Sequence, residues 1–230
     1  MTFVQLIECR TSRLDEMNRL MDRWVEQTKG KRTATHDVIG KDRSDSGHFV
    51  EIVEFASYED AMRNSNLPET DRIFQQMVAL CEETPTFTDL DVVRDEQLNC
   101  LAARGFFEDM GRMAPEDIGD HLTDDYVDDD PSYPEPVHGV EGIREQYAGW
   151  RAAFDFAFRI DDQMAQDDQV CTRWTWSARH NGEFLGIAAT GQDVTMRGMT
   201  WQRFRDGRIC ESHWMYDRAG LLEQLGVLGR

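Results

Sequence analysis

The order of the predicted elements changes near residue 96 of this 230-residue sequence, and no other feature constrains the fold as strongly. Before that point, runs of strand composition alternate with segments whose apolar residues recur at helical spacing. After it, helical segments come first and a long series of strands follows. A chain of this length suits one large domain or two small ones. The change in order therefore predicts two domains, residues 1–95 and 96–230.

The first predicted domain has the order β-α-β-β-α-β. A helix is expected after the first strand, where Leu14, Met17 and Leu20 share one face. Ser57 and Pro68 are typical helix-start residues and predict helices before the last strand. The strands are predicted at residues 3–9, 33–40, 48–55 and 86–93. This order is typical of a ferredoxin-like domain.

This element order, together with the segment FVEIVEFASYEDAMRNSNLPET at residues 49–70, resembles the dimeric α/β-barrel superfamily, which includes the antibiotic-biosynthesis monooxygenase type. The resemblance covers about residues 1–95. It implies a homodimer in which two sheets pair, and some members oxidise aromatic polyketides without a cofactor. No residue set compels a catalytic interpretation here, and the more conservative hypothesis is that this domain dimerises and scaffolds. The candidates by residue type alone are His36, His48, Asn64 and Asn66.

The second predicted domain begins with helices at residues 99–113 and 115–122, followed by an irregular, proline-rich stretch. Helical spacing returns from about Val140, and two strands then flank a turn near residues 166–168. Two further strands and a short helix follow. Helices that precede a long meander of strands predict an α+β cone, in which a curved antiparallel sheet wraps around helices and leaves a pocket at its open end.

Four segments of the second domain carry a second resemblance. They are DYVDDDP (125–131), GVEGIREQYAGWRAAF (139–154), VCTRWTWSARHNGEFLGIAATGQDVTMRGMTWQRFRDGRI (170–209) and HWMYDRAGLLEQLG (213–226). These segments resemble the SnoaL-like polyketide cyclases of the nuclear transport factor 2-like superfamily, over about residues 98–228. The resemblance implies ring closure by intramolecular aldol condensation without a metal or other cofactor. It also implies a hydrophobic small-molecule substrate and a role in secondary metabolism.

Such chemistry needs a base that removes a proton beside a carbonyl group and an acid that protonates the carbonyl oxygen. The resemblance places the acid/base aspartate at Asp217, although this residue is equally suited to capping the terminal helix. Trp214 and Asp217 are three residues apart, whereas the family often has four. On a strand this shift puts His213 on the same side as Asp217, so a His213–Asp217 pair is a further hypothesis. Gln202 is expected to bond a substrate carbonyl, and Phe204 stands where the family has a histidine.

Large aromatic side chains predict a pocket for a flat hydrophobic ligand, although each is individually more typical of a core. Phe184 belongs to a glycine-broken, apolar connection that we expect to fold over the pocket mouth as a rim or lid. Asp128, Asp129 and Asp130 form a carboxylate trio that favours a solvated turn over a cation site. The candidate substrate-binding residues are Trp174, Trp176, Trp201, Tyr126, Phe184, Phe204, Tyr216 and Arg203.

The charge and composition of the chain limit the kinds of partner that it is expected to bind. The chain carries 25 basic and 44 acidic residues, a formal charge of -19, which disfavours nucleic acids and anionic membranes. Its five cysteines are odd in number and lack a CxxC spacing, so they predict buried thiols in a reducing compartment rather than a disulfide framework or zinc site. Without a signal-peptide pattern or a long apolar run, the chain is expected to be cytoplasmic.

Three hypotheses remain open at this point. The first is a cofactor-free cyclase, hydratase or isomerase. The second is a dimeric ligand-binding or scaffold protein that keeps the pocket without the chemistry. The third is another enzyme, either a cofactor-free monooxygenase or an epoxide hydrolase with an Asp–Arg–Asp set, for which Arg203 is available but two carboxylate partners are not apparent from the spacing.

Overall fold

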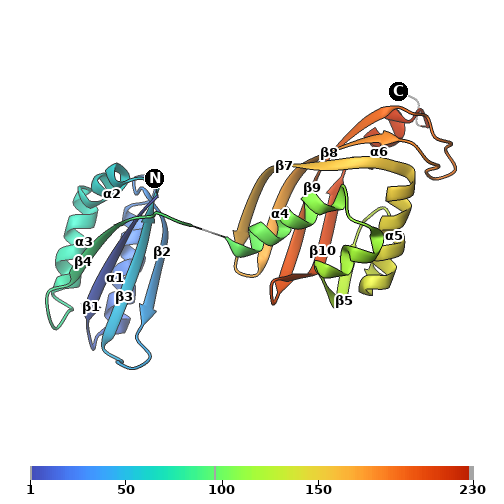
Figure 1. Cartoon of the computed structure of the whole chain (residues 1–230). Coiled ribbons are helices and arrows are strands. Elements are labelled where there is room, and N and C mark those ends of the chain that lie inside the picture. The colour runs from blue at the N-terminus through green and yellow to red at the C-terminus, as the bar shows by residue number, and fades with distance from the viewer. Residues whose placement is uncertain (1, 96, 228–230) are drawn as a thin grey trace. The chain divides into compact units, whose positions relative to one another are not determined.

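A computed structural model describes residues 2–95 and 97–227 and divides the chain into two units, residues 1–95 and 96–230. Both units combine helices with a β-sheet, as Figure 1 shows, so the predicted α+β class is confirmed. Within the described residues, none of the helices is sufficiently long and apolar to span a bilayer.

The first unit consists of one antiparallel sheet and three helices. In chain order the elements are β1 (Phe3–Arg10), α1 (Leu14–Gln27), β2 (Ala34–Lys41), β3 (His48–Phe55), α2 (Tyr58–Ser65), α3 (Pro68–Val78) and β4 (Thr86–Asp91). The strands lie in the order β2-β3-β1-β4. All four strands were predicted within two residues at each end, because their boundaries coincide with turn residues and their interiors with β-branched and aromatic residues.

Alternation along β3 directs every second side chain toward the helices. Phe49, Val53 and Phe55 are buried on that side, while Ile52 is exposed on the other. The helices contribute a second cluster of buried side chains, namely Met17, Leu20, Trp24, Ile73 and Met77. The Ser57 hydroxyl caps α2 by accepting a 3.1 Å hydrogen bond from the Asp60 backbone N–H, which fixes where that helix begins.

The second unit is a six-stranded sheet with helices packed against one face (Figure 1). Its elements are α4 (Leu98–Met110), η1 (Pro115–Asp120), β5 (Leu122–Asp129), β6 (Val137–His138), α5 (Gly139–Ala153), β7 (Phe154–Gln166), β8 (Gln169–His180), β9 (Asp193–Arg205), β10 (Arg208–Tyr216) and α6 (Arg218–Gln224). The strand order is β6-β5-β10-β9-β8-β7. The segment predicted as a helix from Pro115 is a short 3-10 helix.

The prediction of an irregular stretch before Pro131 was wrong, because residues 122–129 form strand β5. This strand runs parallel to β10, so the sheet is not wholly antiparallel. Tyr126 and Asp128 are buried on its inner face, while Val127 and Asp129 are less buried, and this alternation is interrupted nearer the start of the strand, where Asp124 and Asp125 are both exposed. The acidic composition of the segment conceals this alternation, which has the period of a strand.

Backbone hydrogen bonds and close backbone packing hold the connection between β8 and β9 against the rest of the second unit. The Gly182 N–H donates a 2.9 Å hydrogen bond to the Ala153 carbonyl, and a Cβ atom at residue 182 would overlap the Ala152 carbonyl oxygen. Phe184 packs against Trp150 and Phe154, with ring centroids 5.0 and 4.9 Å apart. This connection therefore closes the core, as expected.

Candidate functional site

A cavity of about 610 Å³, counting its open mouth, lies between the helices and the inner face of the six-stranded sheet. Its walls are predominantly aromatic. Gly198 on β9 makes room for one of them, since a Cβ atom there would lie 2.5 Å from Trp174 Cη2 and 2.7 Å from the Met215 carbonyl oxygen. The aromatic residues of the lining are Phe106, Tyr126, Tyr147, Trp150, Phe156, Phe158, Trp174, Trp176, Trp214 and Tyr216.

Asp128 is a nearly completely buried carboxylate in this aromatic wall. Its exposed fraction is 1%. Its Oδ1 atom accepts hydrogen bonds from the Tyr126 hydroxyl at 2.6 Å and from Trp214 Nε1 at 2.8 Å. No donor from the described part of the chain reaches Oδ2. Burial raises the pKa of Asp128 from its ordinary value of 3.8 to about 6, because the hydrogen bonds from Tyr126 and Trp214 only partly offset the loss of solvation.

A second carboxylate, Asp130, lines the same cavity and is held by Tyr216. The Tyr216 hydroxyl lies 2.8 Å from Asp130 Oδ2 and 2.6 Å from Ser132 Oγ. The Ser132 backbone N–H donates to Asp130 Oδ1 at 2.8 Å. Burial, and next the negative charge of Asp130, raise the pKa of Tyr216, so the phenol remains protonated at neutral pH.

The alternation of β5 separates the carboxylate trio. Asp128 and Asp130 face the cavity, whereas Asp129 points to the other side of the strand and pairs with His213 Nδ1 at 2.9 Å. The three carboxylates therefore do not converge on one point. Among the described lining residues, Asp128 and Asp130 are the charged ones, and neither has a cationic partner in the cavity.

The comparisons with known proteins agree with this architecture. The family model of the SnoaL-like polyketide cyclases matches residues 102–225, which is more than half of the chain. This chain belongs to the SnoaL-like polyketide cyclase family. The matched segment does not include residues 1–95, so the dimeric α/β-barrel resemblance of the first unit stays a prediction. No curated protein matches the chain.

Several solved structures are similar to a little more than half of this chain. IdmH from Streptomyces antibioticus, a candidate polyketide cyclase, is 28% identical over 57% of this chain and 100% of its own, with a TM-score of 0.51. AclR from Streptomyces galilaeus, a candidate hydroxylase, is 27% identical over 57% and 87%, with a TM-score of 0.52. TsrD from Streptomyces laurentii is 26% identical over 59% and 99%, with a TM-score of 0.51.

The aspartate that the SnoaL-like resemblance singled out lies outside the cavity lining. Asp217 is exposed, and its Oδ1 accepts a 2.8 Å hydrogen bond from the Gly220 backbone N–H, which caps α6. The cause is the strand alternation of β10, in which Trp214 and Tyr216 point inward. One residue fewer between the tryptophan and the aspartate leaves Tyr216 at the inner position nearest to the strand end.

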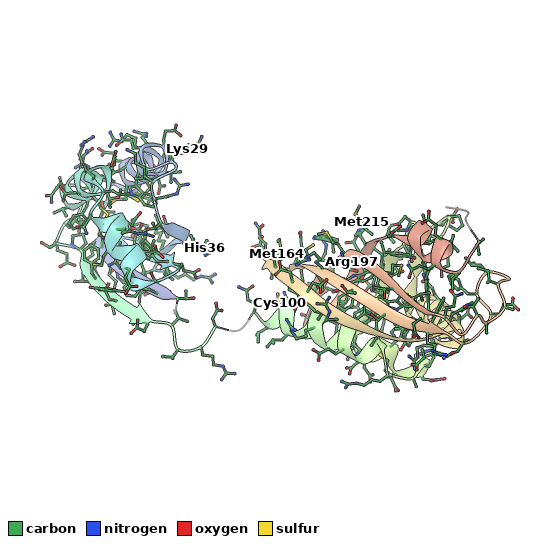
Figure 2. The ribbon with its side chains drawn as sticks, turned by 90° about the horizontal axis from the view of Figure 1, so that it is seen from above. Lys29, His36, Cys100, Met164, Arg197 and Met215 are labelled. Carbon is green, nitrogen blue, oxygen red and sulfur yellow. The ribbon has the colours of Figure 1, made fainter. Side chains whose placement is uncertain are left out.

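The predicted His213–Asp217 pair is not formed. His213 lies on the outer face of β10, as does Met215, which is labelled in Figure 2 and is 71% exposed. The two ring nitrogens of His213 instead contact Asp129 Oδ2 at 2.9 Å and Glu211 Oε1 at 2.8 Å. These contacts place the histidine in a surface network rather than in the SnoaL-like cavity.

Gln202 and Phe204 project inward from β9 but lie outside the cavity lining. Gln202 is fully buried, and neither its Oε1 nor its Nε2 atom has a hydrogen-bond partner in the described part of the chain. Phe204 is part of the core cluster. Both sit toward the end of β9 that is paired with Ser212 and Ile209, beyond the strand segment that forms the cavity wall.

Trp201 and Arg203 lie on the outer face of the sheet. The Arg203 guanidinium contacts Glu211 at 3.2 Å and Asp168 at 3.4 Å, and it stands 5.1 Å from the centre of the Trp201 ring. Arg203 thus has two carboxylate partners, but the set does not face the cavity that an epoxide hydrolase would use.

Phe184 and Leu185, which were expected to cover the pocket mouth, are not among the residues that line the cavity. Phe184 packs against the cavity residue Trp150, and Leu185 is 60% exposed. Four predicted residues do line the cavity, namely Tyr126, Trp174, Trp176 and Tyr216. Sequence reasoning missed the buried state of Asp128 and the contributions of Gln146, Tyr147 and Trp150 to the lining. The period-two pattern of residues 126–130 is the signal that identifies Asp128.

Proposed function

We propose that the second unit is a cofactor-free enzyme that rearranges a neutral, flat, polyketide-like molecule by general acid/base catalysis, with Asp128 as the acid/base. The observation that carries this proposal is a carboxylate with 1% exposure in an aromatic cavity, with one oxygen lacking any donor from the described residues. A carboxyl group with a pKa near 6 both accepts and returns a proton close to neutral pH.

The aromatic walls and the charge of the cavity define the substrate class. Aromatic rings bury large apolar areas and favour a planar ligand. The two carboxylates of the lining repel an anionic substrate and leave a neutral ketone as the best fit for proton abstraction. The known cyclases of this family act on polyketides, and the relative from Streptomyces antibioticus is a candidate polyketide cyclase.

A ring closure at this site needs three steps. Asp128 Oδ2 takes a proton from the carbon beside a carbonyl group, and the resulting enolate carbon attacks a second carbonyl of the same molecule. The proton then passes from Asp128 to the alkoxide oxygen, so the carboxylate is regenerated. Gln146 is suited to hold the first carbonyl oxygen, because it lines the cavity and its Nε2 amide group is a hydrogen-bond donor.

Deuterium exchange tests the first step without knowledge of the full reaction. Polycyclic aromatic ketones are incubated with the protein in D₂O, and exchange beside the carbonyl is followed by NMR. The Asp128→Asn variant should lose about 10²–10⁴ in rate, the usual effect of removing a positioned acid or base. Asp129→Asn is the matched control, because its carboxylate is adjacent in sequence but faces away. Equal rates in all three proteins would favour a binding protein instead.

The first unit supports a separate proposal about assembly. Its strand order and helix placement agree with a ferredoxin-like domain. We propose that it forms a homodimer through the sheet face opposite the helices, where Val38, Ile52 and Leu90 are exposed. An exposed apolar sheet face of this kind is typical of an interface. Light scattering at micromolar concentration should give twice the mass of one chain, and a monomer would contradict the proposal.

The cellular location is also a proposal. The five cysteines are free and partly buried, in agreement with a reducing cytoplasm.

A further inference from the structure

The first unit contains a cavity of its own, between the helix-facing side of its sheet and helices α1 and α3. It measures about 1000 Å³, counting its open mouth. Trp24 Nε1 donates a 3.1 Å hydrogen bond to Thr70 Oγ1, which orients the indole ring beside the cavity. The rings of Phe74 and Phe87 meet edge to face at 5.4 Å. Most of the wall is therefore apolar and includes Ile7, Met21, Trp24, Phe55, Phe74 and Phe87.

Glu51 interrupts this apolar surface. It occupies a helix-facing position of β3, between Phe49 and Val53, where the alternation calls for another hydrophobic side chain. In the sheet it is paired with Ile7 on β1 and with Ile39 on β2. Its side chain is largely buried and lines the cavity. A carboxylate at this position costs free energy unless something compensates its charge.

Nothing in the described part of the chain compensates the charge of Glu51. No hydrogen bond or ion pair reaches its carboxylate, and burial, followed by the charge of Asp37, raises its pKa to about 7. Asp37 is itself partly buried, and its Oδ1 atom has no hydrogen-bond partner among the described residues. The other charged residue of the described lining is Asp71, so this cavity holds no lysine, arginine or histidine.

The remaining polar groups leave Glu51 as the principal anchoring point. The Gln5 amide is already bonded to Asp89 at 2.8 Å, and the Thr70 hydroxyl is bonded to Trp24. Asn64 accepts a hydrogen bond from the Thr33 backbone N–H, and Asp71 is exposed to solvent. The cavity carboxylates of the second unit differ in this respect, because Asp128 and Asp130 each accept two or more hydrogen bonds from neighbouring groups. An unpartnered carboxylate in an aromatic cavity suits a positively charged donor with an apolar body.

We propose that this cavity binds a hydrophobic amine in its ammonium form, with the ammonium group paired to Glu51 and the apolar part packed against Trp24, Phe74 and Phe87. A charge-assisted hydrogen bond to Glu51 is stronger than a bond between neutral groups. The aromatic faces add attraction for the cation. An anion would meet the carboxyl groups of Glu51 and Asp71, and a neutral ligand would gain no charge-assisted hydrogen bond from Glu51.

Calorimetric titration of the full chain with two probes, tryptamine and octylamine, tests this site. Indole-3-acetate and indole-3-ethanol carry the ring of tryptamine with a negative or no charge. Tryptamine should bind about 10–100-fold more tightly than either, the range expected for a hydrogen bond to a charged group. The Glu51→Gln variant should lose the same factor. The matched control is Glu54→Gln, on the same strand but on the opposite sheet face, which should bind like the wild type.

Further variants and a mapping experiment distinguish the remaining outcomes. Asp128→Asn should leave amine binding unchanged, and loss of binding in this variant alone would place the amine in the other cavity and overturn the proposal. Backbone amide shifts of the wild-type protein should change along β3 and α3 on addition of tryptamine, which tests the site even if Glu51→Gln fails to fold. No binding by either amine at millimolar concentration, or equal binding by Glu51→Gln, would also overturn it.

Discussion

The Tyr126 hydroxyl donates a 2.6 Å hydrogen bond to Asp128 Oδ1, and both residues lie on the inner face of β5, two positions apart. This bond favours the ionised carboxylate, whereas burial favours the protonated form. Burial has the larger effect, so the pKa of Asp128 is raised to about 6. The effect of the hydrogen bond on this pKa and the effect of burial can each be measured.

Removing the hydroxyl should raise the pKa of Asp128 further. The Tyr126→Phe variant keeps the ring but loses a hydrogen bond to the charged form, which corresponds to about one to two pH units. Titration of the Asp128 carboxyl carbon by ¹³C NMR measures this directly. Trp214→Phe removes the other donor and should move the pKa in the same direction. A pKa that stays constant or falls in both variants would show that these bonds do not hold the carboxylate.

The stability of the protein should depend on pH through Asp128. Because the folded-state pKa of about 6 exceeds the ordinary value of 3.8, the stabilisation present below pH 3.8 is lost as the pH rises through 6. Asp128→Asn does not titrate, so its stability relative to wild type should increase between pH 4 and pH 7 by up to roughly 3 kcal/mol. Urea unfolding at several pH values gives the difference, and a constant difference would contradict the raised pKa.

Asp217 should matter for stability and not for turnover. Its carboxylate caps α6 at the Gly220 N–H. Asp217→Ala should therefore lower the free energy of unfolding by about 0.5–2 kcal/mol, while Asp217→Asn should change it little. Thermal melting and the deuterium-exchange assay are measured on both variants. A large loss of exchange activity in the stable Asn variant would restore Asp217 as the acid/base.

A methyl group at residue 198 should disturb the cavity wall. The added Cβ atom would lie 2.5 Å from Trp174 Cη2, so the indole or the strand must shift. Gly198→Ala should destabilise the protein by about 1–3 kcal/mol, the usual cost of overpacking. Gly149→Ala on α5 is the control, because no atom lies within 4 Å of its Cβ position, and it should stabilise the helix by up to about 1 kcal/mol. Chemical denaturation of both variants makes the comparison.

The sequence predicts most elements of this fold because periodicity and turn residues mark them clearly. It fails at β5, where two pairs of adjacent aspartates resemble a solvated turn. The aromatic residues Trp174 and Trp176 are predicted correctly as pocket residues, since their strand is regular. Asp217 is misplaced because a shift of one residue along β10 changes which face of the sheet a side chain points to. Gln202 does point inward, but it lies farther along β9 than the cavity, and no sequence pattern reveals that position.

The pairing of β5 with β10 also affects the order in which the strands of this sheet are expected to pair during folding. These strands are adjacent in the sheet but are separated in sequence by α5 and three other long strands. Closing so large a loop is entropically costly and slow, so the pair is expected to form late. Trp214, whose indole N–H donates a hydrogen bond to Asp128, belongs to β10 and reaches the carboxylate only when this strand pairs with β5. The carboxylate is therefore expected to stay hydrated until β10 pairs with β5, so that its desolvation coincides with the closure of the sheet.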